Sequence, residues 1–176
     1  MDELTREIEL SVVLPVYNEA DCLRTFIPEL AGVLQQMGRP YEIVAVDDGS
    51  ADDSVAVLRQ LQRAEPKLVV VQFRRNFGQT AAFVAGFDHA RGDVIVTMDS
   101  DGQNDPADIP HLLEVMEEGD YDLVNGWRKD RKEPFLTRRF PSMVANWLIA
   151  NASDIHLHDR GCSLKALRSD LVKQMN

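Results

Sequence analysis

Short β-rich runs alternate with longer helical stretches along the chain, and this alternation limits the possible folds more than any other feature. Runs of apolar and β-branched residues predict five strands, over residues 10–15, 41–46, 68–73, 94–98 and 121–125. Apolar residues at helical spacing predict helices between them, over residues 19–37, 52–64, 79–90 and 106–118. Such an alternation is typical of an α/β domain whose central sheet is mainly parallel.

Turn and capping residues mark where these helices begin. Asp52 or Asp53 can cap the first turn of the second helix, and Asp105 precedes Pro106 at the start of the fourth. A last stretch, residues 135–150, also has a helical pattern, with a break or kink near its proline. Because no clear linker divides the chain, we expect a single domain over residues 1–176.

Two acidic turns follow two of the predicted strands. Asp47 and Asp48 lie in the stretch DDGS, and Asp99 and Asp101 lie in the stretch DSDGQ. A solvated turn would explain either one alone, since Asp and Gly both favour turns. Together they allow a second interpretation, because the carboxyl ends of parallel strands share one edge of a sheet, where α/β proteins bind ligands. Carboxylates at that edge can hold Mg²⁺ or Mn²⁺ against a diphosphate.

The composition excludes some partners. The chain carries a net charge of −10, so we expect no binding to nucleic acid. Arg and Lys are concentrated in residues 128–139, which suits an anionic substrate, a membrane surface or a solvated loop. The acidic start lacks the basic region of a signal peptide, no apolar run is long enough to span a bilayer, and the two cysteines form no recognisable pattern. These features predict a cytoplasmic protein, peripheral at the cytoplasmic face of the membrane if its substrate is a lipid.

No glycine-rich loop follows the first strand. A dinucleotide-binding domain would carry G-x-G-x-x-G there, whereas this chain has PVYNE at 15–19, and a P-loop is absent as well. We therefore expect a metal ion to mediate phosphate binding, with carboxylates holding the ribose and the base. In this interpretation Asp47 accepts hydrogen bonds from the base or sugar, Tyr17 stacks on the base, and Asp99 and Asp101 hold the ribose and the metal.

Four motifs, taken in order, resemble family 2 glycosyltransferases of the GT-A fold. They are VLPVYNE (13–19), VDDGS (46–50), NFG (76–78) and MDSDGQ (98–103). GWR (126–128) and DRG (159–161) make the chain most similar to the polyprenyl-phosphate sugar transferases of the dolichol-phosphate mannose synthase group. The resemblance extends over residues 10–167 and implies a GT-A type fold, an α/β, Rossmann-like three-layer domain with a mainly parallel central sheet.

Carried over by position, the resemblance implies a role for each matching residue. It assigns nucleotide-sugar binding to Pro15, Tyr17, Glu19, Ala45, Asp47, Asp99, Ser100, Asp101, Gln103 and Arg128. It assigns the metal, Mg²⁺ or Mn²⁺, to Asp99, Asp101 and Gln103, and catalysis to Asp101, Asp159 and Arg128. Simpler roles remain open for five of them: strand-end packing for Pro15 and Tyr17, a turn for Gln103, a solvated charge for Arg128 and a cap for Asp159.

The resemblance also implies a reaction, the inverting transfer of a hexose from a GDP- or UDP-linked sugar to a polyprenyl (dolichyl or undecaprenyl) phosphate. Arg128 would stabilise the departing diphosphate, and Asp159 would orient the acceptor. Two alternatives stay open: an acceptor hydroxyl, which would need Asp159 as a true base, and a non-catalytic nucleotide-sugar binding module. Members of this family usually continue past this point, so we expect a catalytic domain that is truncated on its C-terminal side.

Overall fold

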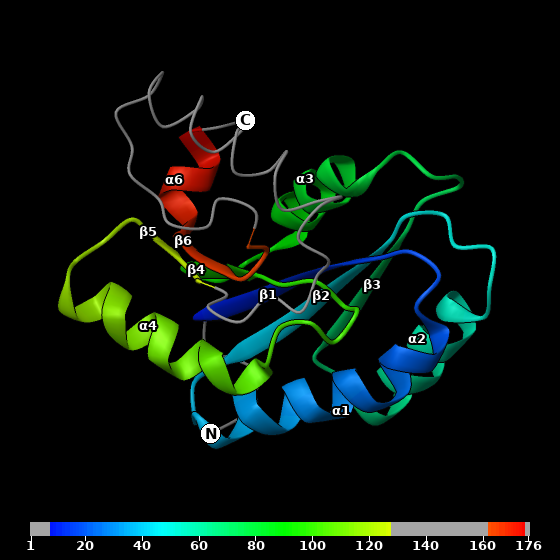
Figure 1. Ribbon diagram of the computed structural model, residues 1–176, viewed down its shortest axis with the longest axis horizontal. Helices are drawn as coiled ribbons and strands as arrows, with labels where there is room; N and C mark the ends of the chain where they lie inside the picture. The colour runs from blue at the N-terminus through cyan, green and yellow to red at the C-terminus, as the bar shows by residue number, and fades with distance from the viewer. Residues whose placement is uncertain (1–7, 128–161, 175–176) are drawn as a thin grey trace, which may run out of the picture.

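The computed structural model describes residues 8–127 and 162–174 (Figure 1). Its strands are β1 (Leu10–Val16), β2 (Tyr41–Asp47), β3 (Leu68–Gln72), β4 (Val94–Thr97), β5 (Leu123–Asn125) and β6 (Lys165–Arg168). Its helices are α1 (Ala20–Gln36), α2 (Ser54–Ala64), α3 (Gln79–His89), the 3₁₀ helix η2 (Pro106–Asp108), α4 (Ile109–Glu118) and α6 (Ser169–Gln174). The five strands and the four helices up to residue 118 that the sequence predicts are all present. The expected helix over 135–150 lies outside the described residues.

The six strands form one sheet in the order β3-β2-β1-β4-β6-β5 (Figure 1). β3, β2, β1 and β4 run parallel, and β6 runs antiparallel between β4 and β5. The direction of strand succession reverses at β1, because β2 lies on one side of it and β4 on the other. At such a position an α/β sheet opens a crevice beyond the carboxyl ends of its strands. The turns after β1, β2 and β4 therefore meet at one edge.

Helices cover both faces of the sheet. α1, α2 and α4 pack on one face, where Leu14 and Leu23 are among the buried residues of the larger core. α3 and α6 cover the other face, where Val13 contributes to a second core (Figure 1). α3 lies so close to the sheet that a Cβ atom at Gly86 would stand 2.2 Å from Val13 Cγ1. The predicted α/β, three-layer architecture with a mainly parallel sheet is confirmed.

The sequence predicts no strand at β6, and this is the main difference in the described fold. Its residues, KALR, have good helix propensity, and only pairing with β4 and β5 makes them extended. β5 begins two residues later than predicted because Tyr121, which follows α4, is still bonded to the last turn of that helix, where its N–H donates to Met116 O at 3.0 Å.

The starts of two helices show how side chains set the boundaries. Asp105 accepts a hydrogen bond from the Ala107 N–H (2.8 Å) and so caps η2, as predicted. A proline in the first turn of α4 delays the α-helix proper to Ile109, since proline is tolerated only in a first helical turn. At α2, Asp52 accepts from the Ser54 N–H (2.9 Å), while Asp53 makes no capping hydrogen bond through its side chain.

An ion pair between a buried carboxylate and an exposed arginine lies near the amino-terminal ends of β1 and β2, far along the strands from the acidic turns. Glu42 is 2% exposed, and its Oε2 accepts hydrogen bonds from Arg91 Nε (2.9 Å) and Nη2 (2.6 Å). Its Oε1 accepts from Ser11 Oγ and from the Arg91 backbone N–H, both at 2.7 Å. Four donors thus satisfy one buried carboxylate, which joins β1, β2 and the segment before β4.

None of the helices in residues 8–127 and 162–174 is both long and apolar enough to cross a membrane.

Candidate active site

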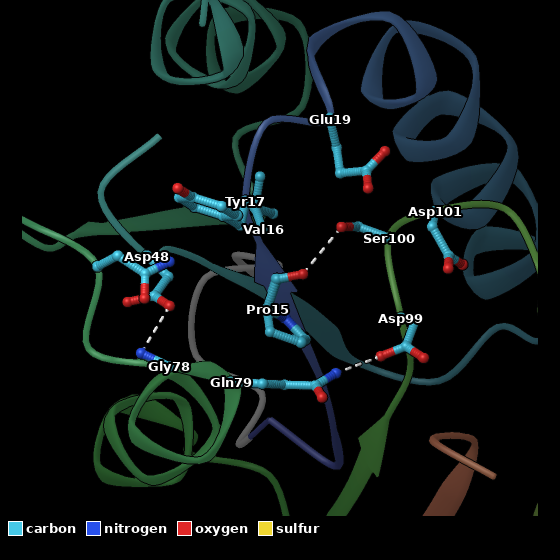
Figure 2. A pocket seen from close by; sticks show the side chains of 11 residues that line it. Pro15, Val16, Tyr17, Glu19, Asp48, Gly78, Gln79, Asp99, Ser100 and Asp101 are labelled. Atoms are coloured by element: carbon cyan, nitrogen blue, oxygen red, sulfur yellow. Dashed lines mark hydrogen bonds between the residues drawn. The ribbon is translucent and has the colours of Figure 1, made fainter. Parts of the chain in front are cut away.

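A cavity of about 380 Å³ opens at the sheet edge where the acidic turns meet (Figure 2). Its lining comes from four segments that are distant in sequence. They are the end of β1 with the turn that follows it (15–19), Asp48 after β2, the start of α3 with the loop before it (76–79), and the turn after β4 (99–101). The structure therefore brings the predicted acidic turns together around one hollow.

Carboxylates dominate one side of this cavity. Glu19, Asp99 and Asp101 lie along it, while Tyr17 and Asp48 lie across from them (Figure 2). Partial burial raises the pKa of Glu19, and the negative charges of Asp101, Asp52 and Asp99 raise it further. The raised pKa records burial together with electrostatic repulsion, and a cation at this position would relieve the repulsion.

The turn after β4 is anchored through uncharged groups. Ser100 Oγ donates to Pro15 O at 2.8 Å, which ties the turn to the end of β1. Asn104 Nδ2 donates to Ser163 Oγ at 2.7 Å, which ties it to the segment before β6. Within the turn, Asp101 Oδ1 accepts from the Gln103 N–H (3.0 Å). Neutral residues thus anchor the turn to β1 and to the segment before β6, while Asp101 uses one oxygen within the turn.

Asp48 fixes the loop on the opposite wall. Its Oδ1 accepts from the Phe77 N–H (2.7 Å) and its Oδ2 from the Gly78 N–H (2.9 Å). Gly78 has φ +95°, a conformation that favours glycine, and α3 begins at the next residue. Both oxygens of Asp48 thus bind backbone, so this acid positions the first residue of α3.

Two residues expected on the nucleotide pocket, Ala45 and Asp47, are not among the described residues that line the cavity. Ala45 is 0% exposed and belongs to the hydrophobic core, because it lies inside β2 opposite Leu14. Asp47 is also 0% exposed, and Asp48 rather than Asp47 lines the cavity. Asp47 Oδ2 accepts from the backbone N–H groups of Gly49 and Ser50, both at 3.2 Å. In the described part of the chain, its buried Oδ1 has no hydrogen-bond partner.

The remaining predicted residues divide into three groups. Pro15, Tyr17, Glu19, Asp99, Ser100 and Asp101 line the cavity. Gln103 is exposed and is not part of the lining, although it adjoins Asp101. Arg128 and Asp159 lie outside the described residues, as do the basic residues after position 127. The structure adds Asp48, Asn76 and Gln79 to the lining. The motifs DDGS and NFG point to this neighbourhood, but they do not identify which side chains face the cavity.

The donor set fits a hard divalent cation whose coordination is completed by a ligand. Within the described ranges, no three His, Cys, Asp or Glu side chains are gathered closely enough to hold a metal alone. Mg²⁺ and Mn²⁺ commonly take one or two carboxylates and leave other positions to phosphate and water. Asp99 and Asp101, both on the cavity and carried by one turn, are a donor pair of this kind.

Comparisons with a family model and with curated proteins find relatives over nearly the whole chain. The model of glycosyl transferase family 2 matches residues 11–175. The dodecaprenyl-phosphate galacturonate synthase of Rhizobium johnstonii is 42% identical over 171 residues, which cover 97% of this chain and 51% of the relative. The undecaprenyl-phosphate 4-deoxy-4-formamido-L-arabinose transferase of Edwardsiella ictaluri is 43% identical over 167 residues, which cover 94% of this chain and 51% of the relative. The chain therefore spans about half the length of these curated relatives.

Solved structures share the fold at low sequence identity. The mannosyltransferase PcManGT from Pyrobaculum calidifontis, in complex with GDP-Man and Mn²⁺, gives a TM-score of 0.67 at 19% identity and covers 98% of this chain and 48% of its own. The glucosyl-3-phosphoglycerate synthase of Mycobacterium tuberculosis, in complex with Mn²⁺, UDP-Glc and phosphoglyceric acid, gives a TM-score of 0.72 at 22% identity. The match covers 93% of this chain and 57% of the synthase chain. These structures are GT-A glycosyltransferases, and the expected GT-A fold is confirmed. With the family model matched from β1 to the end of α6, the chain belongs to glycosyl transferase family 2.

Proposed function

We propose that this chain is the catalytic domain of a transferase that moves a sugar from a nucleotide-diphosphate sugar to a polyprenyl phosphate. The names of both curated relatives describe polyprenyl-phosphate acceptors, which supports this acceptor class. The observation that carries the proposal is the charge of the cavity. Its described lining contains Glu19, Asp48, Asp99 and Asp101 and no Lys, Arg or His. An anionic diphosphate can enter such a cavity only with a cation beside the carboxylates.

We propose Asp99 and Asp101 as the residues that hold this cation, Mg²⁺ or Mn²⁺. When bound, the cation would stabilise the charge that develops on the departing diphosphate. Gln103 would take part in holding the cation, because its backbone N–H donates to Asp101 Oδ1 and so places the residue beside that acid. Arg128, outside the described residues, remains our candidate for a second positive charge on the leaving group.

The nucleoside part of the donor would occupy the side of the cavity near Tyr17 and Asp48. Tyr17 is 48% exposed, which leaves an aromatic face available for stacking on a base. Asp47 remains a candidate for hydrogen bonding to the base or sugar, because its buried Oδ1 lacks a donor among the described residues. The donor would be a GDP- or UDP-linked hexose, as are the ligands named for the two solved structures.

A lipid phosphate is already anionic, so it needs positioning more than a base. We therefore assign Asp159 to orienting the acceptor, in an inverting attack from the face opposite the diphosphate. The basic residues at 128–139 would compensate the acceptor's charge at the cytoplasmic face of a membrane.

Calorimetric titration tests the donor side. GDP- and UDP-sugars are titrated with and without Mn²⁺ or Mg²⁺ into the wild type, Asp101→Ala and Asp53→Ala. Asp53 is the matched control, because it is an exposed acid that does not line the cavity. We expect metal-dependent binding of one base class, lost in Asp101→Ala and kept in Asp53→Ala. Binding that ignores both the cation and Asp101 would refute the site.

Replacing Asp159 by Asn tests the acceptor. If the acceptor is a lipid phosphate, sugar transfer to it should slow but continue, since no proton has to be removed. If turnover with a polyprenyl phosphate is abolished, or if only a carbohydrate hydroxyl accepts the sugar, the lipid-phosphate assignment is wrong. Binding of the donor without any product from a matched acceptor would instead favour a non-catalytic module.

A further inference from the structure

Gln79 reaches across the cavity to one of the two proposed metal-binding acids. It is the first residue of α3, and its exposed side chain lines the cavity. Its Nε2 donates a hydrogen bond of 2.7 Å to Asp99 Oδ1 (Figure 2). An amide occupies one lone pair of a carboxylate without neutralising its charge, as Lys or Arg would. Asp99 therefore keeps its negative charge and its second oxygen.

The two acids of the DSD motif are held in different ways. Asp101 Oδ1 accepts from the Gln103 N–H, which belongs to the same turn. Asp99 takes its hydrogen bond from a different element, α3, on the other side of the cavity. The orientation of Asp99 thus depends on where α3 begins, whereas that of Asp101 is a local property of the turn.

The start of α3 is itself fixed by the turn after β2. Asp48 binds the N–H groups of Phe77 and Gly78, immediately before Gln79. Gly49 lies directly against the same loop, because a Cβ atom there would stand 2.3 Å from the carbonyl carbon of Arg75. A continuous path of contacts therefore runs from the end of β2, through this loop, to Gln79 and Asp99.

We propose that Gln79 is a positioning residue, which orients the Asp99 carboxylate so that its second oxygen is presented to the cation; this rests on the proposed function. A carboxylate fixed in one orientation loses less freedom on binding an ion. Groups that hydrogen-bond to metal ligands typically change metal affinity by roughly 10–100-fold when they are removed. For one hydrogen bond from an uncharged, exposed donor, we expect the lower end of this range.

The test measures Mn²⁺ affinity in the full chain by the loss of the electron paramagnetic resonance signal of free Mn²⁺, with GDP and with UDP present. Gln79→Met keeps the length of the side chain and removes the donor, and Thr80→Ala is the control one residue further along α3. We expect the dissociation constant for Mn²⁺ to rise about tenfold in Gln79→Met and to stay unchanged in Thr80→Ala. Any residual nucleotide binding without metal should be equal in both variants.

A double-mutant cycle separates positioning from a general structural effect. If Gln79 acts through Asp99, Gln79→Met should cause no further loss in an Asp99→Asn background. An equal loss in both backgrounds would overturn the inference, and so would wild-type Mn²⁺ affinity in Gln79→Met. Those two results would leave the proposed function intact, whereas failure of the wild type to bind Mn²⁺ with either nucleotide would refute both.

Discussion

Replacing Asp48 by asparagine should release the loop before α3 without unfolding the domain. Asp48 is 3% exposed, and its two oxygens accept hydrogen bonds from the Phe77 and Gly78 N–H groups at 2.7 and 2.9 Å. A hydrogen bond to a charged group contributes about 1.5–3 kcal/mol. Asparagine has the same shape but only one acceptor oxygen, and it turns an NH₂ group toward the second donor. We therefore expect the loop to lose about 2 kcal/mol of local stability.

Amide hydrogen exchange measures this loss at the two residues concerned. Because each 1.4 kcal/mol is a factor of ten, a loss of about 2 kcal/mol makes exchange at Phe77 and Gly78 about 30-fold faster. Amides in the middle of β1 should keep their protection. The control is Asp53→Asn, since Asp53 makes no capping hydrogen bond through its side chain. Unchanged exchange at both amides in Asp48→Asn would refute the argument that this carboxylate holds the loop.

Three further substitutions test the packing and electrostatics described above. Glu42→Gln should lower the free energy of unfolding, measured in urea, by about 3 kcal/mol, since an amide cannot accept from donors on both sides. The control Glu117→Gln, from an exposed ion pair, should lower it by at most about 0.5 kcal/mol. Equal losses in the two variants would contradict the role of burial. Gly86→Ala should cost about 1–3 kcal/mol in thermal unfolding, because the new Cβ atom would meet Val13 Cγ1 at 2.2 Å, and an unchanged Tm would show that α3 can move away freely. Glu19→Gln should raise Tm at pH 7, because burial and neighbouring aspartates raise the pKa of Glu19 and so disfavour its charged form in the folded state. The gain in Tm should vanish as the pH falls below 4.5, the usual pKa of a glutamate, where the side chain is protonated in both states. A gain that does not depend on pH would contradict this cause.

The parallel part of the sheet was predictable because local preference and burial agree there. β1 and β2 are rich in Val, Ile and Leu and are buried on both faces, as near-continuous apolar runs predict. β6 was not predictable, because its residues favour a helix in isolation and become a strand only between β4 and β5. The pairing partner decides that element, and a local pattern does not contain this information.

The location of the site was predictable, but its individual side chains were less so. Strand ends and the rule for α/β sheets placed both acidic turns at one edge, and the cavity lies there. Successive residues of a strand point to opposite sides, so one of two adjacent acids had to face away, and the pattern DD alone does not say which. Gln79 was missed because its role depends on a contact with Asp99, twenty residues further along the chain.

The acidic residues at this edge divide into those that build it and those that remain available to a ligand. Asp48 and Asp52 use both oxygens to accept backbone N–H groups, so the fold already engages both oxygens of each acid. Asp99 and Asp101 each accept a single hydrogen bond through Oδ1, and in the described part of the chain their Oδ2 atoms have no hydrogen-bond donor.

The fold therefore holds carboxylates close together by neutral anchors, and this has a cost: burial first, and then the charges of neighbouring aspartates, raise the pKa of Glu19. A cation that binds only the folded state recovers this cost, so it stabilises the domain in proportion to the logarithm of its concentration over its dissociation constant. In the proposed function, relief of this repulsion by the cation would add to the affinity for a metal-bound diphosphate. In the proposed function, Asp48 holds backbone at this edge through both oxygens, whereas Asp99, which accepts from one side chain, would bind the cation.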